Sequence, residues 1–107
     1  MATLRDCYND VVNNLDFKRI QSVMRFMNWT YGTDHHPPTI EELKRTCEEL
    51  FNSACQYLLE TNESRVTTST GGFEVMVCKC IEDEKTIFTC SIGFVIEECI
   101  TSTNDLE

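Results

Sequence analysis

The sequence is short of basic residues, with nine Lys and Arg against eighteen Asp and Glu in 107 residues. The resulting net charge of −9 argues against nucleic acid as a direct partner, because proteins that bind phosphate backbones cluster Lys and Arg. Long apolar runs are also missing, and none approaches the roughly 20 residues of a membrane-spanning helix. This length and an ordinary globular composition predict one domain over residues 1–107.

A secretory signal pattern is missing too, because the N-terminal residues reach a charge and a helical pattern at once. The chain has an odd number of cysteines, mostly at positions with apolar patterning: Cys7, Cys47, Cys55, Cys78, Cys80, Cys90 and Cys99. Free cysteines behave as small buried hydrophobes in a reducing compartment. We therefore expect a cytoplasmic protein without cofactors.

The negative charge lies in one part of the chain. Residues 1–38 are balanced, whereas residues 39–107 carry five basic and fourteen acidic residues. Such a distribution attracts basic surfaces, although acidic side chains also serve solubility. The candidate acidic face consists of Glu48, Glu49, Glu82, Asp83, Glu84, Glu97 and Glu98.

Apolar spacings of three and four predict a first helix over residues 3–28, with a change of phase near Phe17. Pro37 and Pro38 end any continuation. A second helix is expected over residues 39–60, where Thr39 and Glu42 form a capping box at its start.

Alternating apolar residues then predict an antiparallel hairpin over residues 71–96, with a polar turn at residues 82–85 and a flexible tail at 97–107. The expected fold is α+β in the order ααββ. Because two strands alone are marginal, one edge of the hairpin is a candidate for pairing with a second copy. That pairing would give a four-stranded sheet and a two-fold homodimer.

Metal binding and nucleophilic catalysis have weak support in the sequence. Cys78 and Cys80 share a strand face, but no second cysteine pair stands at zinc-site spacing. Neither His35 nor His36 accompanies a cysteine in a recognisable nucleophile context. We expect neither a metal site nor an enzyme.

Two further segments leave alternatives open. The run Ser69, Thr70, Gly71, Gly72 and Phe73 could bind an anion through its backbone, or could be a kink where a strand begins. It lacks the Lys and the following helix of a phosphate loop. As a binding site it would suit a module that captures a small ligand such as a cyclic nucleotide.

Trp29 and Tyr31 could form an exposed aromatic contact with a partner protein. They could equally cap the core where the two expected helices meet.

Three segments carry a resemblance over residues 20–95: Phe26-Met27-Asn28-Trp29, Pro38-Thr39-Ile40-Glu41-Glu42-Leu43 and Ser69-Thr70-Gly71-Gly72-Phe73. Together they resemble small uncharacterised proteins of tailed phages and prophages. The resemblance implies a phage-encoded protein in a bacterial host cytoplasm and brings no catalytic residues with it.

Small acidic phage proteins include inhibitors of host defence, such as anti-CRISPR proteins. By analogy, the chain would be a non-catalytic inhibitor that binds the basic surface of a CRISPR nuclease through an acidic face that mimics nucleic acid. A structural or regulatory phage accessory protein is the remaining alternative.

Overall fold

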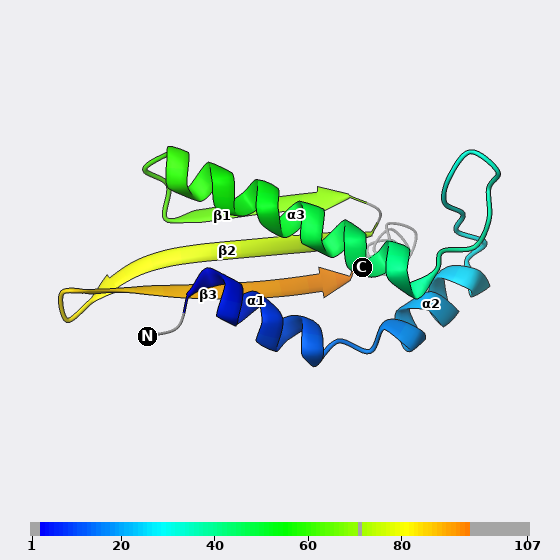
Figure 1. Cartoon of the computed structure of the whole chain (residues 1–107), viewed down its shortest axis with the longest axis horizontal. Helices are drawn as coiled ribbons and strands as arrows, with labels where there is room; N and C mark the ends of the chain where they lie inside the picture. The colour runs from blue at the N-terminus through cyan, green and yellow to red at the C-terminus, as the bar shows by residue number, and fades with distance from the viewer. Residues whose placement is uncertain (1–2, 71, 95–107) are drawn as a thin grey trace, which may run out of the picture.

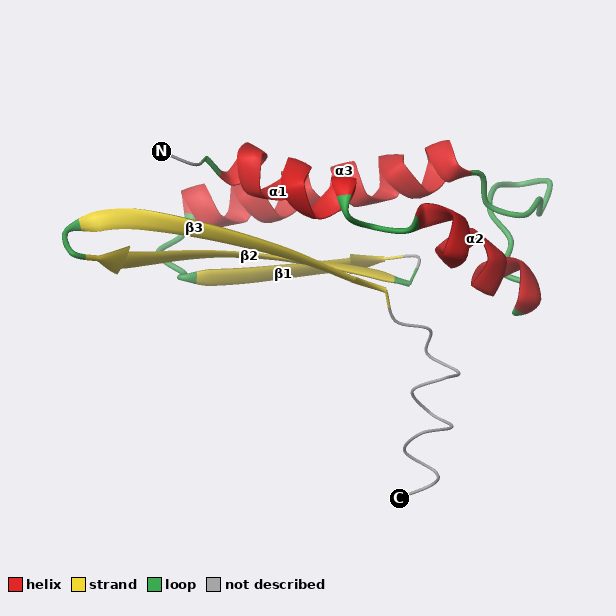
Figure 2. Ribbon diagram, turned by 90° about the horizontal axis from the view of Figure 1, so that it is seen from below, coloured by secondary structure: helices red, strands yellow, loops and turns green. Residues whose placement is uncertain are grey.

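A computed structural model describes residues 3–70 and 72–94 of the chain. In chain order the elements are α1 (Leu4–Asn13), α2 (Phe17–Phe26), α3 (Ile40–Glu60), β1 (Arg65–Thr70), β2 (Phe73–Glu82) and β3 (Lys85–Phe94) (Figure 1). The strands form one antiparallel sheet in the order β1-β2-β3. Helices α1 and α3 lie on one face of this sheet, whose other face is open within the same residues, and α2 packs against α3 beyond the end of the strands (Figure 2). The α+β class is confirmed, and the described residues form three helices and three strands in place of the expected two and two.

The single helix expected over residues 3–28 is divided into α1 and α2. Thr3 caps α1 reciprocally with Asp6, whose backbone N–H donates to the Thr3 hydroxyl at 3.1 Å. Asp16 starts a new helix, because its carboxylate accepts the backbone N–H of Arg19 at 3.1 Å. The new direction allows Phe17 to reach the core, where it is 6% exposed.

Helix α3 is the central element of the helical layer. Its N-cap is Thr39, whose hydroxyl accepts the Glu42 backbone N–H at 3.1 Å. One face of α3 supplies half of the buried apolar residues: Leu43, Cys47, Leu50, Phe51, Ala54 and Leu58. The remaining core residues come from α1, α2 and β2 and are Tyr8, Phe17, Met24, Phe73, Val75 and Val77. The core therefore lies between α3 and the inner face of the sheet.

Strand β1 was not expected from the sequence. It has a single apolar residue, Val66, which stands opposite Val77 of β2. Its inward-facing Thr68 has a hydrogen-bond partner in α3, because the Thr68 hydroxyl donates to the carbonyl oxygen of Leu50 at 2.8 Å. A strand whose inward positions include threonine gives only a weak apolar alternation.

The hairpin between β2 and β3 has a shorter turn than expected. Glu82 and Lys85 are the last paired residues, so the turn consists of Asp83 and Glu84 alone. The expected hairpin residues 95–96 and the tail 97–107 lie outside the described residues.

Helix α1 packs along β3, one of the two edge strands of the described sheet (Figure 1). The Cys7 thiol donates to the carbonyl oxygen of Phe88 at 3.3 Å. This contact engages one carbonyl oxygen of β3, and the pairing of a sheet edge with a second copy stays a prediction.

Candidate functional site

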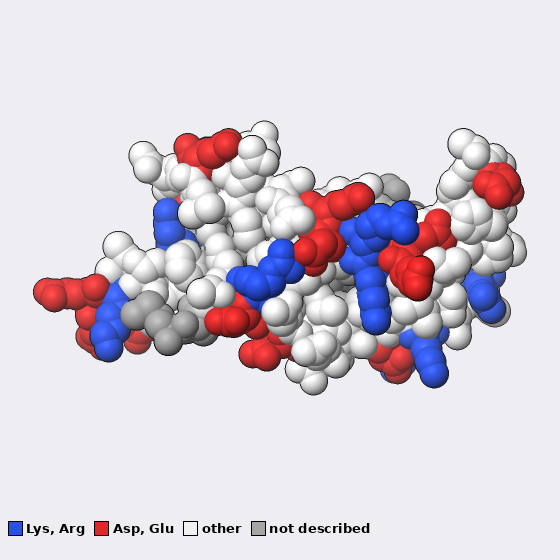
Figure 3. Space-filling model, in the orientation of Figure 1, with Lys and Arg blue, Asp and Glu red and all other residues white. Residues whose placement is uncertain are grey.

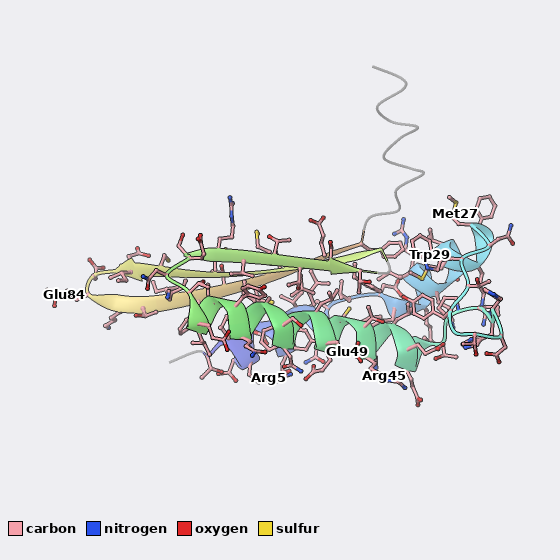
Figure 4. All side chains as sticks on the ribbon, turned by 90° about the horizontal axis from the view of Figure 1, so that it is seen from above. Arg5, Met27, Trp29, Arg45, Glu49 and Glu84 are labelled. Carbon is pink, nitrogen blue, oxygen red and sulfur yellow. The ribbon has the colours of Figure 1, made fainter. Side chains whose placement is uncertain are left out.

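The described members of the expected acidic face fall into two separate groups. Glu48 and Glu49 lie in the middle of α3, whereas Glu82, Asp83 and Glu84 lie at the end of the β2–β3 hairpin. Glu49 and Glu84 are far apart along the molecule (Figure 4). Glu97 and Glu98 lie outside the described residues.

Glu48 belongs to a contact that joins α1 to α3. Its carboxylate is 2.8 Å from the Arg5 guanidinium, which also donates to Asn52 at 3.4 Å. The same guanidinium lies 5.3 Å from the ring centre of Tyr8 and 4.9 Å from that of Phe51. We call these five residues the Arg5 cluster.

Within the Arg5 cluster, the Tyr8 and Phe51 rings stack with centroids 4.3 Å apart. Burial and, after it, the Glu48 carboxylate raise the pKa of Tyr8. The charge of Glu48 is thus already engaged by Arg5 and contributes little to an outward-facing acidic surface.

Glu49 is exposed but does not lie in an acidic patch. Arg45 stands one helical turn before it in α3. Basic and acidic side chains are interspersed over α3 in the space-filling view (Figure 3). This part of the surface is therefore of mixed charge.

The second group forms what we call the acidic tip, residues 81–87. Its three carboxylates, on Glu82, Asp83 and Glu84, are exposed, and the hairpin that carries them extends past the helices at this end (Figures 1 and 3). Asp83 has φ +51° and Glu84 has φ +64°, so both turn residues occupy the left-handed region. Such a turn matches the twist of the flanking strands.

The acidic tip also has a basic residue and two apolar ones. Lys85 stands opposite Glu82 in the strand register. Ile81 is 78% exposed and Ile87 is 38% exposed. The acidic tip thus combines carboxylates and aliphatic side chains on a tight turn.

Ser69 and Thr70 end β1 and Phe73 begins the antiparallel β2, with Thr70 opposite Phe73. Gly72 has φ +89°, a conformation that glycine adopts without strain. The Phe73 side chain is buried, 5.3 Å from the Phe94 ring centre. Gly71 lies outside the described residues. The turn and the core therefore account for Gly72 and Phe73 without a ligand.

Trp29 and Tyr31 are partly buried and pack against the core. The backbone N–H of Trp29 donates to the Met24 carbonyl at 2.8 Å, and Tyr31 pairs with His36 in an isolated β-bridge. Trp29 lies at the α2 end of the molecule (Figure 4). These contacts favour the core-capping interpretation. An aromatic residue that sequence reasoning missed, Phe26, is 83% exposed.

The histidine loop has a structural hydrogen-bond pattern. One ring nitrogen of His36 bonds the Pro37 carbonyl at 2.9 Å, and the other lies 3.4 Å from the Glu42 carboxylate. The Pro37 carbonyl, then Glu42 and Asp34, raise the pKa of His36, although partial burial opposes them. The Thr39 backbone N–H lowers the pKa of Glu42.

The buried thiols are poorly suited to nucleophilic chemistry. Burial raises the pKa of Cys47 to about 12 and that of Cys90 to about 11, which disfavours the reactive thiolate. Among residues 3–70 and 72–94, three or more His, Cys, Asp or Glu side chains do not gather in an arrangement that could hold a metal ion.

No protein-family model, curated protein or solved structure matches this chain. Over the part of the chain that is described, none of the helices has both the length and the apolar character needed to cross a membrane.

Proposed function

We propose that this chain is a non-catalytic interaction protein that binds a basic protein surface through its acidic tip. The observation that carries the proposal is the exposure of Glu82 at the end of β2 and of Asp83 and Glu84 in the two-residue turn that follows it, at the end of the molecule. Carboxylates make strong charge-assisted hydrogen bonds with Arg and Lys. A tight hairpin also restricts the backbone before binding, which lowers the entropic cost of association.

The three carboxylates resemble the closely spaced phosphates of a nucleic acid in charge. A basic groove that normally holds a nucleic-acid strand is therefore the partner surface we favour. Together with the resemblance to phage proteins, this leads us to propose inhibition of a host defence nuclease, such as a CRISPR nuclease, in a bacterial cytoplasm. Glu49 is a secondary contact, and Glu48 has a structural role through Arg5.

The test reverses charge at the tip by Glu82→Lys with Glu84→Lys. The matched control is Asp10→Lys with Glu63→Lys, which changes net charge equally at exposed positions outside the acidic tip. Both proteins are expressed in hosts that carry CRISPR nucleases, and phage plating efficiency is measured. Inhibition of the purified nuclease is then measured on plasmid DNA at several salt concentrations.

The wild type and the control should restore phage plating and inhibit cleavage, more weakly at high salt. The tip variant should lose both effects. Equal inhibition by the tip variant and the wild type would refute binding through the acidic tip. If the wild type protects phage in none of these hosts, the defence-inhibitor proposal is wrong.

A separate measurement addresses the small-ligand alternative at the Ser69–Phe73 turn. Cyclic nucleotides are expected to leave the thermal midpoint unchanged, because a ligand that binds the folded state would raise it with concentration. A concentration-dependent rise would favour ligand capture over the proposed interaction function.

A further inference from the structure

Helix α2 has an exposed basic face in an otherwise acidic protein. Phe17 and Met24 turn toward the core, and the exposed positions of the helix are Lys18, Arg19, Ser22, Val23, Arg25 and Phe26. We call these six residues the basic α2 face. The sequence of α2 contains no Asp or Glu. The basic α2 face therefore carries three cations.

The basic α2 face also exposes large apolar side chains. Phe26 is 83% exposed and Val23 is 36% exposed, and they lie three residues apart on the helix. Protein interfaces typically have an apolar centre, which the partner buries, and a polar or charged rim. A large apolar side chain among cations fits such an interface with an acidic partner.

The acidic tip has the complementary composition at the opposite end of the molecule. Figure 1 places α2 at one end and the β2–β3 turn at the other. Glu84 and Met27, the residue that follows α2, mark these two ends in Figure 4. The acidic tip pairs its carboxylates with exposed Ile81, as the basic α2 face pairs its cations with Val23 and Phe26. Ile87 stands opposite Cys80 and so lies on the other face of the hairpin from Ile81.

We propose that the acidic tip of one copy docks on the basic α2 face of a second copy. The carboxylates meet Lys18, Arg19 and Arg25 at the rim of the contact, and Ile81 packs against Phe26 at its centre. Because the two surfaces lie at opposite ends, a single copy cannot satisfy both within itself. The contact is heterologous, and with the copies arranged end to end each added copy leaves one complementary surface free, so the assembly continues beyond a dimer.

The contact area is small, since one hairpin end meets one side of a ten-residue helix. Interfaces below about 1,200 Å² are weak and transient. We therefore expect reversible association that increases with protein concentration and weakens with salt. This inference does not rest on the proposed function, because it requires only the pure protein.

The test measures mass by sedimentation velocity from about 10 μM to about 500 μM protein. The wild type should increase in average mass without reaching a plateau at the dimer. Lys18→Glu with Arg19→Glu should stay monomeric, and so should Glu82→Lys with Glu84→Lys. The first pair keeps the helix intact, because carboxylates are favourable in the first turn of a helix. Far-UV circular dichroism and thermal midpoints confirm that both variants fold.

An equimolar mixture of the two variants should regain association, since each then finds an intact complementary surface. Arg65→Glu, an exposed reversal on β1, is the control and should associate like the wild type. Phe26→Ser keeps every charge and should weaken association by about tenfold.

A monomeric wild type over the whole concentration range would overturn the proposal. So would a mass that levels at the dimer, or association that both charge-reversed variants retain. A mixture of folded variants that stays monomeric would also contradict the pairing of these two surfaces.

Discussion

The turn at Asp83 and Glu84 gives a stability prediction that can be worked out from the backbone. Both residues have positive φ, a conformation that costs an L-residue other than glycine roughly 1–2 kcal/mol. Asp tolerates this conformation better than Glu, because its short side chain bonds locally. The strain relieved by substitution is therefore greater at Glu84.

The perturbation is Glu84→Gly. Glycine removes the strain of about 1–2 kcal/mol but adds about 0.5–1 kcal/mol of backbone entropy to the unfolded chain. The net expectation is a stabilisation of about 0.5–1 kcal/mol. For a domain of about 100 residues this raises the thermal midpoint by roughly 3–6 °C.

The matched control is Glu82→Gly, which removes the same charge from a paired position of β2. Glycine inside a strand should cost about 0.5–1 kcal/mol, so the two variants should shift stability in opposite directions. Calorimetry gives the midpoints, and urea titration with an unchanged slope confirms a pure stability effect. Equal shifts for both variants, or a lower midpoint for Glu84→Gly, would refute the argument from backbone strain.

Three further predictions concern the Arg5 cluster, the histidine loop and the core. Tyr8→Ala should lower the free energy of unfolding, measured by urea titration, by about 3 kcal/mol, because it removes a buried ring stacked on the Phe51 ring. A decrease below about 1 kcal/mol would mean that α1 contributes little to stability. Glu42 has a lowered pKa and should lose its stabilising contribution as pH falls below about 4.5, whereas His36 has a raised pKa and should lose its contribution as pH rises above about 6.5. Glu42→Gln should therefore flatten the acidic side of a stability–pH curve and also weaken the dependence on the neutral side, because the Glu42 carboxylate helps to raise the pKa of His36. His36→Gln should flatten the neutral side, and unchanged curves would exclude these linkages. The Cys47 thiol is fully buried and its pKa is raised to about 12, so it should react with iodoacetamide only as fast as the protein unfolds. Peptide mass spectrometry measures the rate of labelling at Cys47. Labelling in the folded protein as fast as that of a free thiol would contradict the burial of Cys47.

The sequence predicted the elements whose apolar spacing is strong. In α3 the stripe from Leu43 to Leu58 has helical spacing, and the capping residues Thr39 and Glu42 mark its start. Strand β2 alternates clearly because Val75 and Val77 face the core. In such segments local pattern and tertiary burial agree.

The features that were predicted wrongly or not at all have different physical causes. Asp16 can stand within a helix or cap a new one, and the packing of Phe17 decides between these outcomes. Strand β1 depends on its pairing with β2 and on the Thr68 hydrogen bond, neither of which a local pattern contains. Glu48 looked like a free carboxylate because its partner, Arg5, lies 43 positions earlier in the chain.

The packing of α1 on β3 has a consequence for the order in which the elements of the protein can fold. Cys7 and Phe88, which touch across this contact, are 81 positions apart in the sequence. During synthesis α1 therefore leaves the ribosome long before the strand it packs on exists. A ten-residue helix is marginal in water without a partner surface. We expect α1 to dock only after α3 and the sheet have assembled.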